Sequence, residues 1–218
     1  MRSYDISKSR WKAWAKNQQK TFNGKLNIQL VTIPTKGHQL GVVAREHIKK
    51  NTDIAVYIVE VLKENTYTSP LGDTYNIGVC DAKGNHIPDR IGMLTLPCLV
   101  DDLYLGLPRW GAFFNEPSPK ESVNVEVKFD SIHSLKAPGR KGKATLQVAK
   151  MRTTRAVKPG EELVWCYGDE YVRDYPTSCE GKQKQNQKQN QKQKRPNPKQ
   201  KQKQLPNGTS KATAIVLD

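Results

Sequence analysis

Most of the chain consists of short apolar runs separated by polar turns that contain glycine or proline. Val123–Phe129 shows this pattern clearly, because its apolar residues alternate with polar ones at the period of two of a half-buried strand. The expected strands are Leu26–Ile33, Gly41–Arg45, Ile54–Leu62, Tyr75–Cys80, Val123–Phe129, Ala144–Lys150 and Glu162–Tyr167. Such short strands between turn signals predict a mostly β domain. The apolar pattern of residues 91–107 leaves open whether they form a short helix or a loop.

An amphipathic helix is predicted before the first strand, over residues 7–22, and Gly24 ends it. One face of this helix carries Trp11, Trp14, Ala15 and Phe22. The main interpretation is a helix that packs its tryptophans on the domain. The alternative is a basic amphipathic segment for a membrane surface or a partner, although it has few large apolar residues for that role.

The C-terminal part of the chain has a different composition. From Gly181 to Gln204 only Lys, Gln, Asn, Pro, one Arg and one Gly occur. A segment with nothing apolar to bury cannot offset the entropy cost of ordering, so we expect it to be disordered. The expected organisation is an N-terminal helix in residues 1–24, a folded domain in residues 25–176 and a disordered Lys/Gln-rich tail in residues 177–218.

The formal net charge of +15 is concentrated in this tail. From Gly181 onward, nine Lys and one Arg stand against a single acid, Asp218. A tail of this kind predicts weak, salt-sensitive contact with nucleic acid. It lacks interleaved aromatic residues, so no sequence readout is expected. The modest charge of the remaining chain argues against a nucleic-acid-binding surface on the domain itself.

The four cysteines, Cys80, Cys98, Cys166 and Cys179, show no CxxC or CxC spacing. A structural zinc site therefore has no ligand set, and we expect no metal. No signal-peptide core follows Met1, and no apolar run is long enough to span a bilayer. We therefore expect a nuclear or cytoplasmic monomer that does not contact membranes and whose cysteines are free thiols.

Four segments carry the candidate chemistry. They are Gly37–Ala44 (GHQLGVVA), Ile54–Val61 (IAVYIVEV), Phe113–Pro117 (FFNEP) and Val157–Gly168 (VKPGEELVWCYG), with Tyr171 shortly after the last. In this order and with these gaps they resemble the SET domain, over about residues 25–175. The PGEEL run followed by Tyr167-Gly168 is the most specific of the four.

The resemblance implies a β-clip fold of short strands with a C-terminal pseudoknot, and transfer of a methyl group from S-adenosylmethionine to a protein lysine. Cofactor and lysine would enter from opposite faces and meet in a narrow channel. Tyr167 would orient the amine and Tyr57 would line the channel, with Tyr171 and Trp165 bordering the substrate. The implied cofactor-binding residues are Gly37, His38, Gln39, Leu40, Asn115 and Glu116.

This chemistry needs few reactive side chains. The attacking amine must be neutral, yet the pKa of a free lysine is near 10.4. An apolar channel and an adjacent sulfonium charge both favour the neutral amine. The protein then mainly supplies alignment, so neither a metal nor a nucleophilic side chain is required.

Several positions depart from the family's usual pattern. Gln39 replaces a glycine of the first motif, Val59 replaces a glycine of the second, and Ala112 and Glu116 replace Arg and His around Asn115. Gln39 would cost energy if its backbone needed a positive φ. The cysteine-rich zinc cluster that follows some SET domains is absent, so closure of the lysine channel would come from elsewhere, such as Tyr171 to Tyr175.

The sequence therefore predicts an S-adenosylmethionine-dependent protein-lysine methyltransferase, whose substrate could be a histone tail or another protein lysine. The alternative is a catalytically inactive SET-like binding module, tethered to nucleic acid or chromatin by its basic tail. A third hypothesis is a nucleic-acid-binding protein whose β domain only resembles SET.

Overall fold

The computed structural model describes residues 8–63, 76–81, 83–94, 101–136, 143–168, 171 and 173–179. Met1–Glu180 groups as one compact unit. The Lys/Gln-rich tail was predicted to be disordered. Its residues from 180 onward lie outside the described part of the chain, and so does Cys98. No helix within the described ranges is both long enough and apolar enough to cross a membrane.

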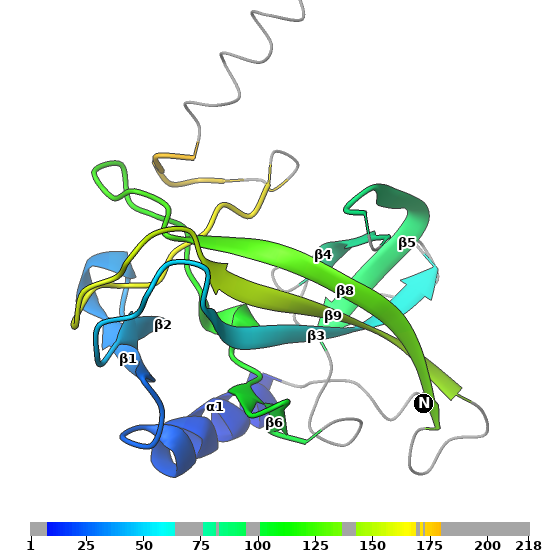
Figure 1. Cartoon of the computed structure of the whole chain (residues 1–218), viewed down its shortest axis with the longest axis horizontal. Helices are drawn as coiled ribbons and strands as arrows, with labels where there is room; N and C mark the ends of the chain where they lie inside the picture. The colour runs from blue at the N-terminus through cyan, green and yellow to red at the C-terminus, as the bar shows by residue number, and fades with distance from the viewer. Residues whose placement is uncertain are drawn as a thin grey trace, which may run out of the picture. The chain divides into compact units, whose positions relative to one another are not determined.

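An antiparallel five-stranded sheet forms the centre of the unit (Figure 1). Its strand order is β4 (Asn76–Cys80), β5 (His86–Leu94), β3 (Asp53–Lys63), β9 (Lys143–Thr153) and β8 (Val125–Lys136). The central strand β3 is apolar on both faces. Tyr57 and Val59 lie in the main core, whereas Val56 and Ile58 pack in a second cluster on the other face. The period of two in β3 therefore directs Tyr57 toward the main core.

A smaller hairpin lies beside this sheet. It consists of β1 (Ile28–Ile33) and β2 (Gln39–Ala44), joined through the short 3-10 helix η1 (Pro34–Lys36). A second short hairpin, β6 (Leu103–Tyr104) with β7 (Leu107–Pro108), leads to the 3-10 helix η3 (Gly111–Phe113). This arrangement brings the first and third sequence motifs to neighbouring positions, because η3 leads directly into Asn115.

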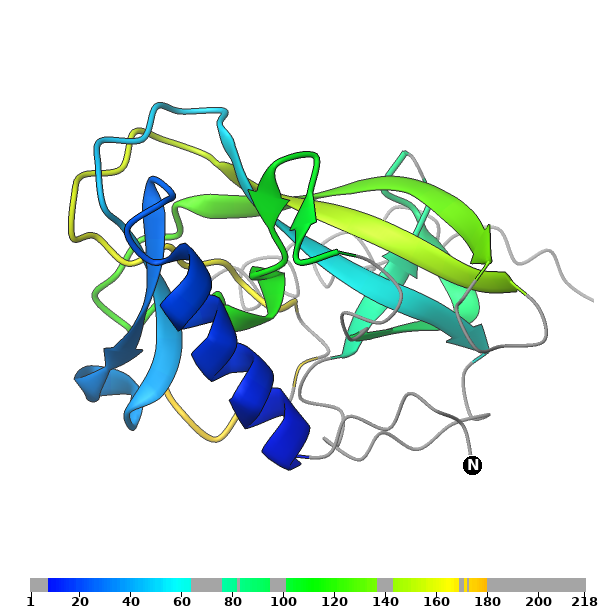
Figure 2. The same ribbon diagram turned by 90° about the horizontal axis from the view of Figure 1, so that it is seen from below.

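The N-terminal helix α1 (Lys8–Phe22) packs against β1, as Figure 2 shows. The side chains of Gln19 and Asn23 both donate to the carbonyl oxygen of Leu30, at 3.2 and 2.8 Å. Trp14 is buried in the main core. The indole N–H of Trp110 donates to the side-chain oxygen of Gln18 at 3.0 Å. The prediction of a helix that packs its tryptophans on the domain is confirmed.

The last motif passes through the fold as a pseudoknot. It first runs beside β2, where Ala44 N–H donates to the Glu161 carbonyl at 3.0 Å and Leu163 N–H to the Val42 carbonyl at 2.8 Å. It then runs beside the third motif, where Trp165 N–H donates to the Asn115 carbonyl at 3.1 Å. The sequence predicted a strand over Glu162–Tyr167, and this is wrong. The segment makes isolated bridges instead, because its partner changes from β2 to Asn115 within a few residues.

The other predicted strands are present with shifted ends. β5 begins at His86, where no strand was predicted. It extends into residues 91–107, for which the sequence left open a short helix or a loop. Its run HIPDR interrupts the apolar pattern and leaves most of these side chains exposed. The mostly β fold with an N-terminal helix and a C-terminal pseudoknot is confirmed.

Candidate active site

A pocket of about 1260 Å³ lies between α1, the loop from η1 to β2, the segment Gly111–Pro119 and residues near the C-terminal end of the described chain. The predicted site residues that line it are Tyr57, Gly37, Gln39, Leu40, Asn115, Glu116, Trp165, Tyr167 and Tyr171. His38 does not line it; its side chain is exposed and its φ is 59°. Residues separated by more than a hundred positions in the sequence thus converge on one cavity.

Tyr167 is held from both ends. Its hydroxyl donates to the carbonyl oxygen of Phe114 at 2.9 Å, and its backbone N–H donates to the Glu116 carboxylate at 2.7 Å. Its ring makes edge contacts with those of Trp165 and Tyr171, with centroids 5.3 and 4.9 Å apart. Burial, then the neighbouring Tyr175 and Tyr171, raise the pKa of Tyr167 well above its ordinary value. The phenol therefore stays protonated and can donate a hydrogen bond at neutral pH.

Tyr57 enters the pocket from β3 and packs directly under η3. A Cβ placed on Gly111 would lie 2.3 Å from the Cβ of Tyr57, closer than real side chains approach. Only glycine allows the two backbones to come this near. The floor of the pocket thus depends on the pairing of Tyr57 with Gly111.

The loop predicted to hold the cofactor is fixed by Asn115. The Asn115 side-chain amide donates to the carbonyl oxygen of Leu40 at 3.2 Å and to Glu162 Oε1 at 2.9 Å. In this loop Gly37 has a φ of 67°, but the backbone of Gln39 has no positive φ. Gln39 therefore causes no backbone strain at the position where the family usually has glycine. What the loop offers a ligand is mainly its backbone and the exposed side chain of Gln39.

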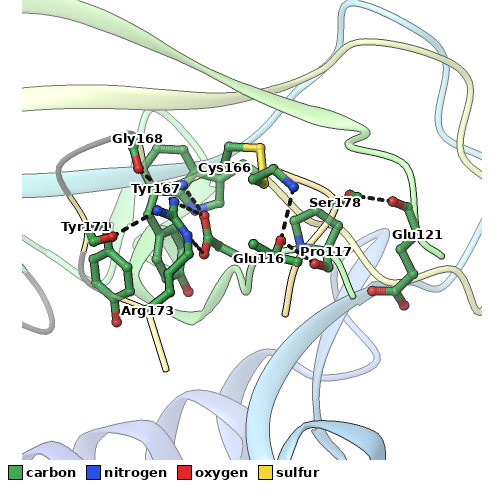
Figure 3. Close-up of a disulfide and its surroundings, with 12 residues drawn as sticks. Glu116, Pro117, Glu121, Cys166, Tyr167, Gly168, Tyr171, Arg173 and Ser178 are labelled. Carbon is green, nitrogen blue, oxygen red and sulfur yellow. Dashed lines mark hydrogen bonds and ion pairs between the residues drawn. A yellow bond between two sulfur atoms is a disulfide. The ribbon is translucent and has the colours of Figure 1, made fainter. Parts of the chain in front are cut away.

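Glu116 is buried, and its carboxylate is fully engaged. Arg173 donates to it through Nε at 2.7 Å and Nη2 at 2.6 Å, and Tyr175 donates its hydroxyl at 3.0 Å. With the Tyr167 N–H, the two oxygens accept four hydrogen bonds. The side chains of Glu116 and Arg173 are 1% and 8% exposed, so the ion pair is buried. The Glu116 side chain positions Tyr167 and the C-terminal segment (Figure 3), while its place among the cofactor-binding residues remains a prediction.

This C-terminal segment, here called the strap, comprises the described residues among 168–179. Arg173 also donates to the carbonyl oxygens of Tyr171 at 2.8 Å and Gly168 at 2.7 Å. Thr177 donates its hydroxyl to the Pro117 carbonyl at 2.6 Å, and Ser178 to the Glu121 carbonyl at 2.7 Å (Figure 3). The strap is therefore hydrogen-bonded to Glu116 and Pro117 of the third motif and to Glu121 beyond it. Thr177–Cys179, assigned to the tail from the sequence, pack with the domain instead.

A disulfide joins the end of the strap to the chain just before it. Cys166 and Cys179 are bonded, with their Cα atoms 5.7 Å apart and a sequence separation of 13. The expectation that the cysteines are free thiols is wrong for this pair, whereas Cys80 is free. The possible ligand atoms of Cys166, Cys179 and Glu116 lie within 4.8 Å of one another, which is close enough for a shared metal ion. In the oxidised form, however, the sulfurs are bonded to each other and the carboxylate is paired with Arg173, which leaves that group no free ligand.

Lys36 joins three parts of the pocket wall. Its ammonium donates to the Glu116 carbonyl and to Glu162 Oε2, both at 2.8 Å, and lies 3.1 Å from Glu121 Oε2. The role of Lys36 and that of Arg173 were missed from the sequence. Two neighbouring acids are also paired with basic residues, Glu161 with Arg155 and Glu162 with Lys36. Neither the role of Lys36 nor that of Arg173 has a local signal in the sequence, because each pairing forms only when distant segments meet in the fold.

The SET domain family model matches residues 39–168, which is more than half of the chain. No curated protein gives a significant sequence match. The fold is similar to the methyltransferase domain of human PR domain-containing protein 2, at 16% identity over 73% of this chain and 87% of that one, with a TM-score of 0.39.

Two further solved structures are similar at a comparable level. ATXR5, in complex with mono-methylated histone H3.1, is 16% identical over 80% of this chain and 72% of its own, with a TM-score of 0.39. CpSET8 from Cryptosporidium is 15% identical over 79% of this chain and 71% of its own, also with a TM-score of 0.39. The extent of the family match, on a chain whose four motifs meet at one pocket, decides the assignment: this protein belongs to the SET-domain family.

Proposed function

We propose that this protein transfers a methyl group from S-adenosylmethionine to the side-chain amine of a protein lysine. The observation that carries the proposal is the position of Tyr167. Its protonated hydroxyl and the Phe114 carbonyl lie together in a pocket that Tyr57 and the Gly37–Leu40 loop also line. The hydrogen of the hydroxyl is donated to the Phe114 carbonyl, so its oxygen is oriented to accept an N–H of an amine, which suits the alignment of that amine.

The residues present fit S-adenosylmethionine. A volume of about 1260 Å³ leaves room for the cofactor and an incoming lysine side chain. The backbone of Gly37–Leu40 and of Asn115–Glu116 would hold the polar parts, and the rings of Trp165 and Tyr171 line the same cavity. When bound, the cofactor would supply a methyl group on a sulfonium sulfur, whose carbon a neutral amine can attack in line, so that the C–N bond forms as the C–S bond breaks and the thioether leaves.

The protein's own residues then prepare the amine. Enclosure by Tyr57, Tyr167 and Trp165 lowers the pKa of an entering lysine, because burial disfavours its charged form. The Tyr167 hydroxyl oxygen, held by its hydrogen bond to the Phe114 carbonyl, can accept a hydrogen bond from the amine and so direct the amine's lone pair. Tyr167 stays un-ionised throughout, because its own pKa is raised. Alignment of this kind is worth up to roughly 7–11 kcal/mol of the barrier in favourable cases.

A second candidate is the inactive binding module. It is favoured by one observation: the Asn115 amide and the Glu116 carboxylate are both spent on protein partners, which leaves the cofactor mainly backbone groups. The two candidates differ in whether the pocket binds S-adenosylmethionine. Contact of the basic tail with nucleic acid, and a nuclear or cytoplasmic location, remain predictions from the sequence.

The test is calorimetric titration of S-adenosylmethionine into the full chain, followed by labelled methyl transfer to a mixed lysate and to core histones. Amino-acid analysis of labelled protein identifies the modified residue. Saturable binding with label in methyl-lysine supports the enzyme. Absence of binding at millimolar cofactor would contradict it and leave the binding module. Label in another residue would contradict the lysine assignment alone.

A further inference from the structure

We infer that Lys12 and Lys16 of α1 form a basic rim on the pocket and select substrates whose target lysine is flanked by acidic residues. This inference rests on the proposed function for the identity of the target, but the rim itself is a feature of the described structure. The two lysines are one helical turn apart, and both line the pocket. Both side chains are exposed, so they lie where the pocket meets solvent.

The rim has a fixed position because α1 is anchored on the side of the pocket. Trp11 stacks on Phe113 with ring centroids 4.9 Å apart, and Trp14 stacks on the same ring at 5.5 Å. Phe113 belongs to η3, which packs over Tyr57. Aromatic contacts therefore hold the helix that carries the two lysines against the floor of the same pocket.

The other charged residues that line the pocket have ion-pair partners. Lys36 lies between the carboxylates of Glu162 and Glu121, and Glu116 is paired with Arg173. Lys12 and Lys16 form no ion pair or hydrogen bond with the described part of the chain. Among the described residues that line the pocket, these two lysines are therefore the charges without a partner, and both are positive.

This charge pattern decides between classes of substrate peptide. A lysine in a basic sequence, such as a histone tail, brings further positive charge to a positive rim and is repelled. A lysine with Asp or Glu a few residues away brings the opposite charge. Charge complementarity at an interface changes mainly specificity and association rate, and salt screens it. We expect the acidic peptide to bind about five- to tenfold more tightly at low salt.

The experiment compares two fluorescent peptides with the same central lysine, one with four flanking Glu and one with four flanking Lys. Binding is measured by anisotropy, and methyl transfer is measured on the same peptides. The variant Lys12→Glu with Lys16→Glu reverses the rim. The matched control is Lys20→Glu with Lys25→Glu, which makes the same charge change at exposed lysines that do not line the pocket.

The inference predicts that the wild type and the control prefer the acidic peptide, that the rim variant prefers the basic one, and that salt weakens both preferences. Equal binding of the two peptides to the wild type would overturn it, as would an equal response of rim and control variants. A rim variant that loses cofactor affinity but keeps the peptide preference would also overturn it, since the lysines would then bind the cofactor's carboxylate. Acidic preference in binding without methyl transfer would support the rim and contradict the proposed enzyme.

Discussion

The buried carboxylate of Glu116 and the guanidinium of Arg173 form a two-pronged ion pair, with hydrogen bonds of 2.7 and 2.6 Å. The same carboxylate accepts the backbone N–H of Tyr167, so one acid fixes both the strap and the candidate catalytic tyrosine. A residue that departs from the family's usual pattern thereby holds the strap in place.

Breaking this pair is expected to be costly. Arg173→Gln leaves the Glu116 charge buried without its partner, which should lower the free energy of unfolding by about 3 kcal/mol. Hydrogen exchange of the strap should rise at the same time. The matched control is Arg152→Gln, which breaks the partly exposed pair with Asp53 and should cost less than about 1 kcal/mol. If chemical denaturation gives the same loss of unfolding free energy for both variants, the buried Glu116–Arg173 pair stabilises the fold no more than the partly exposed pair does.

Reduction of the disulfide should loosen the strap. A dithiol reductant that converts Cys166–Cys179 to two thiols should lower the free energy of unfolding by about 2–3 kcal/mol, because it frees a loop of this length in the unfolded state. The double variant Cys166→Ser with Cys179→Ser should be insensitive to the reductant, and Cys80→Ser should behave as the wild type. Intact mass before and after reduction checks the bond, and a wild type with three or more alkylatable thiols under non-reducing denaturation would refute it.

The close approach of η3 to β3 predicts a severe effect of one methyl group. Gly111→Ala places a Cβ against the backbone and side chain of Tyr57, which should destabilise the fold by about 1–3 kcal/mol and distort the pocket. Gly78→Ala is the control, since its Cβ would meet only the edge of the His86 ring at 3.3 Å. Thermal unfolding of both variants measures the difference, and a Gly111 variant as stable as the control would contradict the packing described.

The shared neighbourhood of Tyr167 and Tyr175 sets a dependence on alkaline pH. Burial raises the pKa of both hydroxyls in the folded state, and Glu116 raises that of Tyr175 further. Both states keep these protons below the unfolded pKa near 10, so the two groups contribute no pH dependence there. Above pH 10 the unfolded state releases protons that the folded state retains, and stability should fall. Denaturant unfolding between pH 8 and 11 should show a shallower fall for Tyr167→Phe than for the wild type; equal slopes would disagree with the burial of Tyr167.

Much of this arrangement could be predicted from the sequence because its signals are local. Helical spacing located α1, alternation located most strands, and the motifs supplied the residues that line the pocket. The disulfide and the Arg173 pair could not be predicted, since both depend on the strap folding back over Pro117 and Glu121. Glu162–Tyr167 has the apolar pattern of a strand, but its partner changes halfway along, and only the three-dimensional path reveals that.

The most direct test of the central claim is labelled methyl transfer by the wild type, Tyr167→Phe and Tyr104→Phe, each with its S-adenosylmethionine affinity measured in parallel. Tyr104 is a partly buried tyrosine of β6 that does not line the pocket. The account predicts that Tyr167→Phe binds the cofactor normally but transfers methyl groups roughly 10²-fold more slowly, while Tyr104→Phe matches the wild type. Undiminished transfer by Tyr167→Phe would contradict the account.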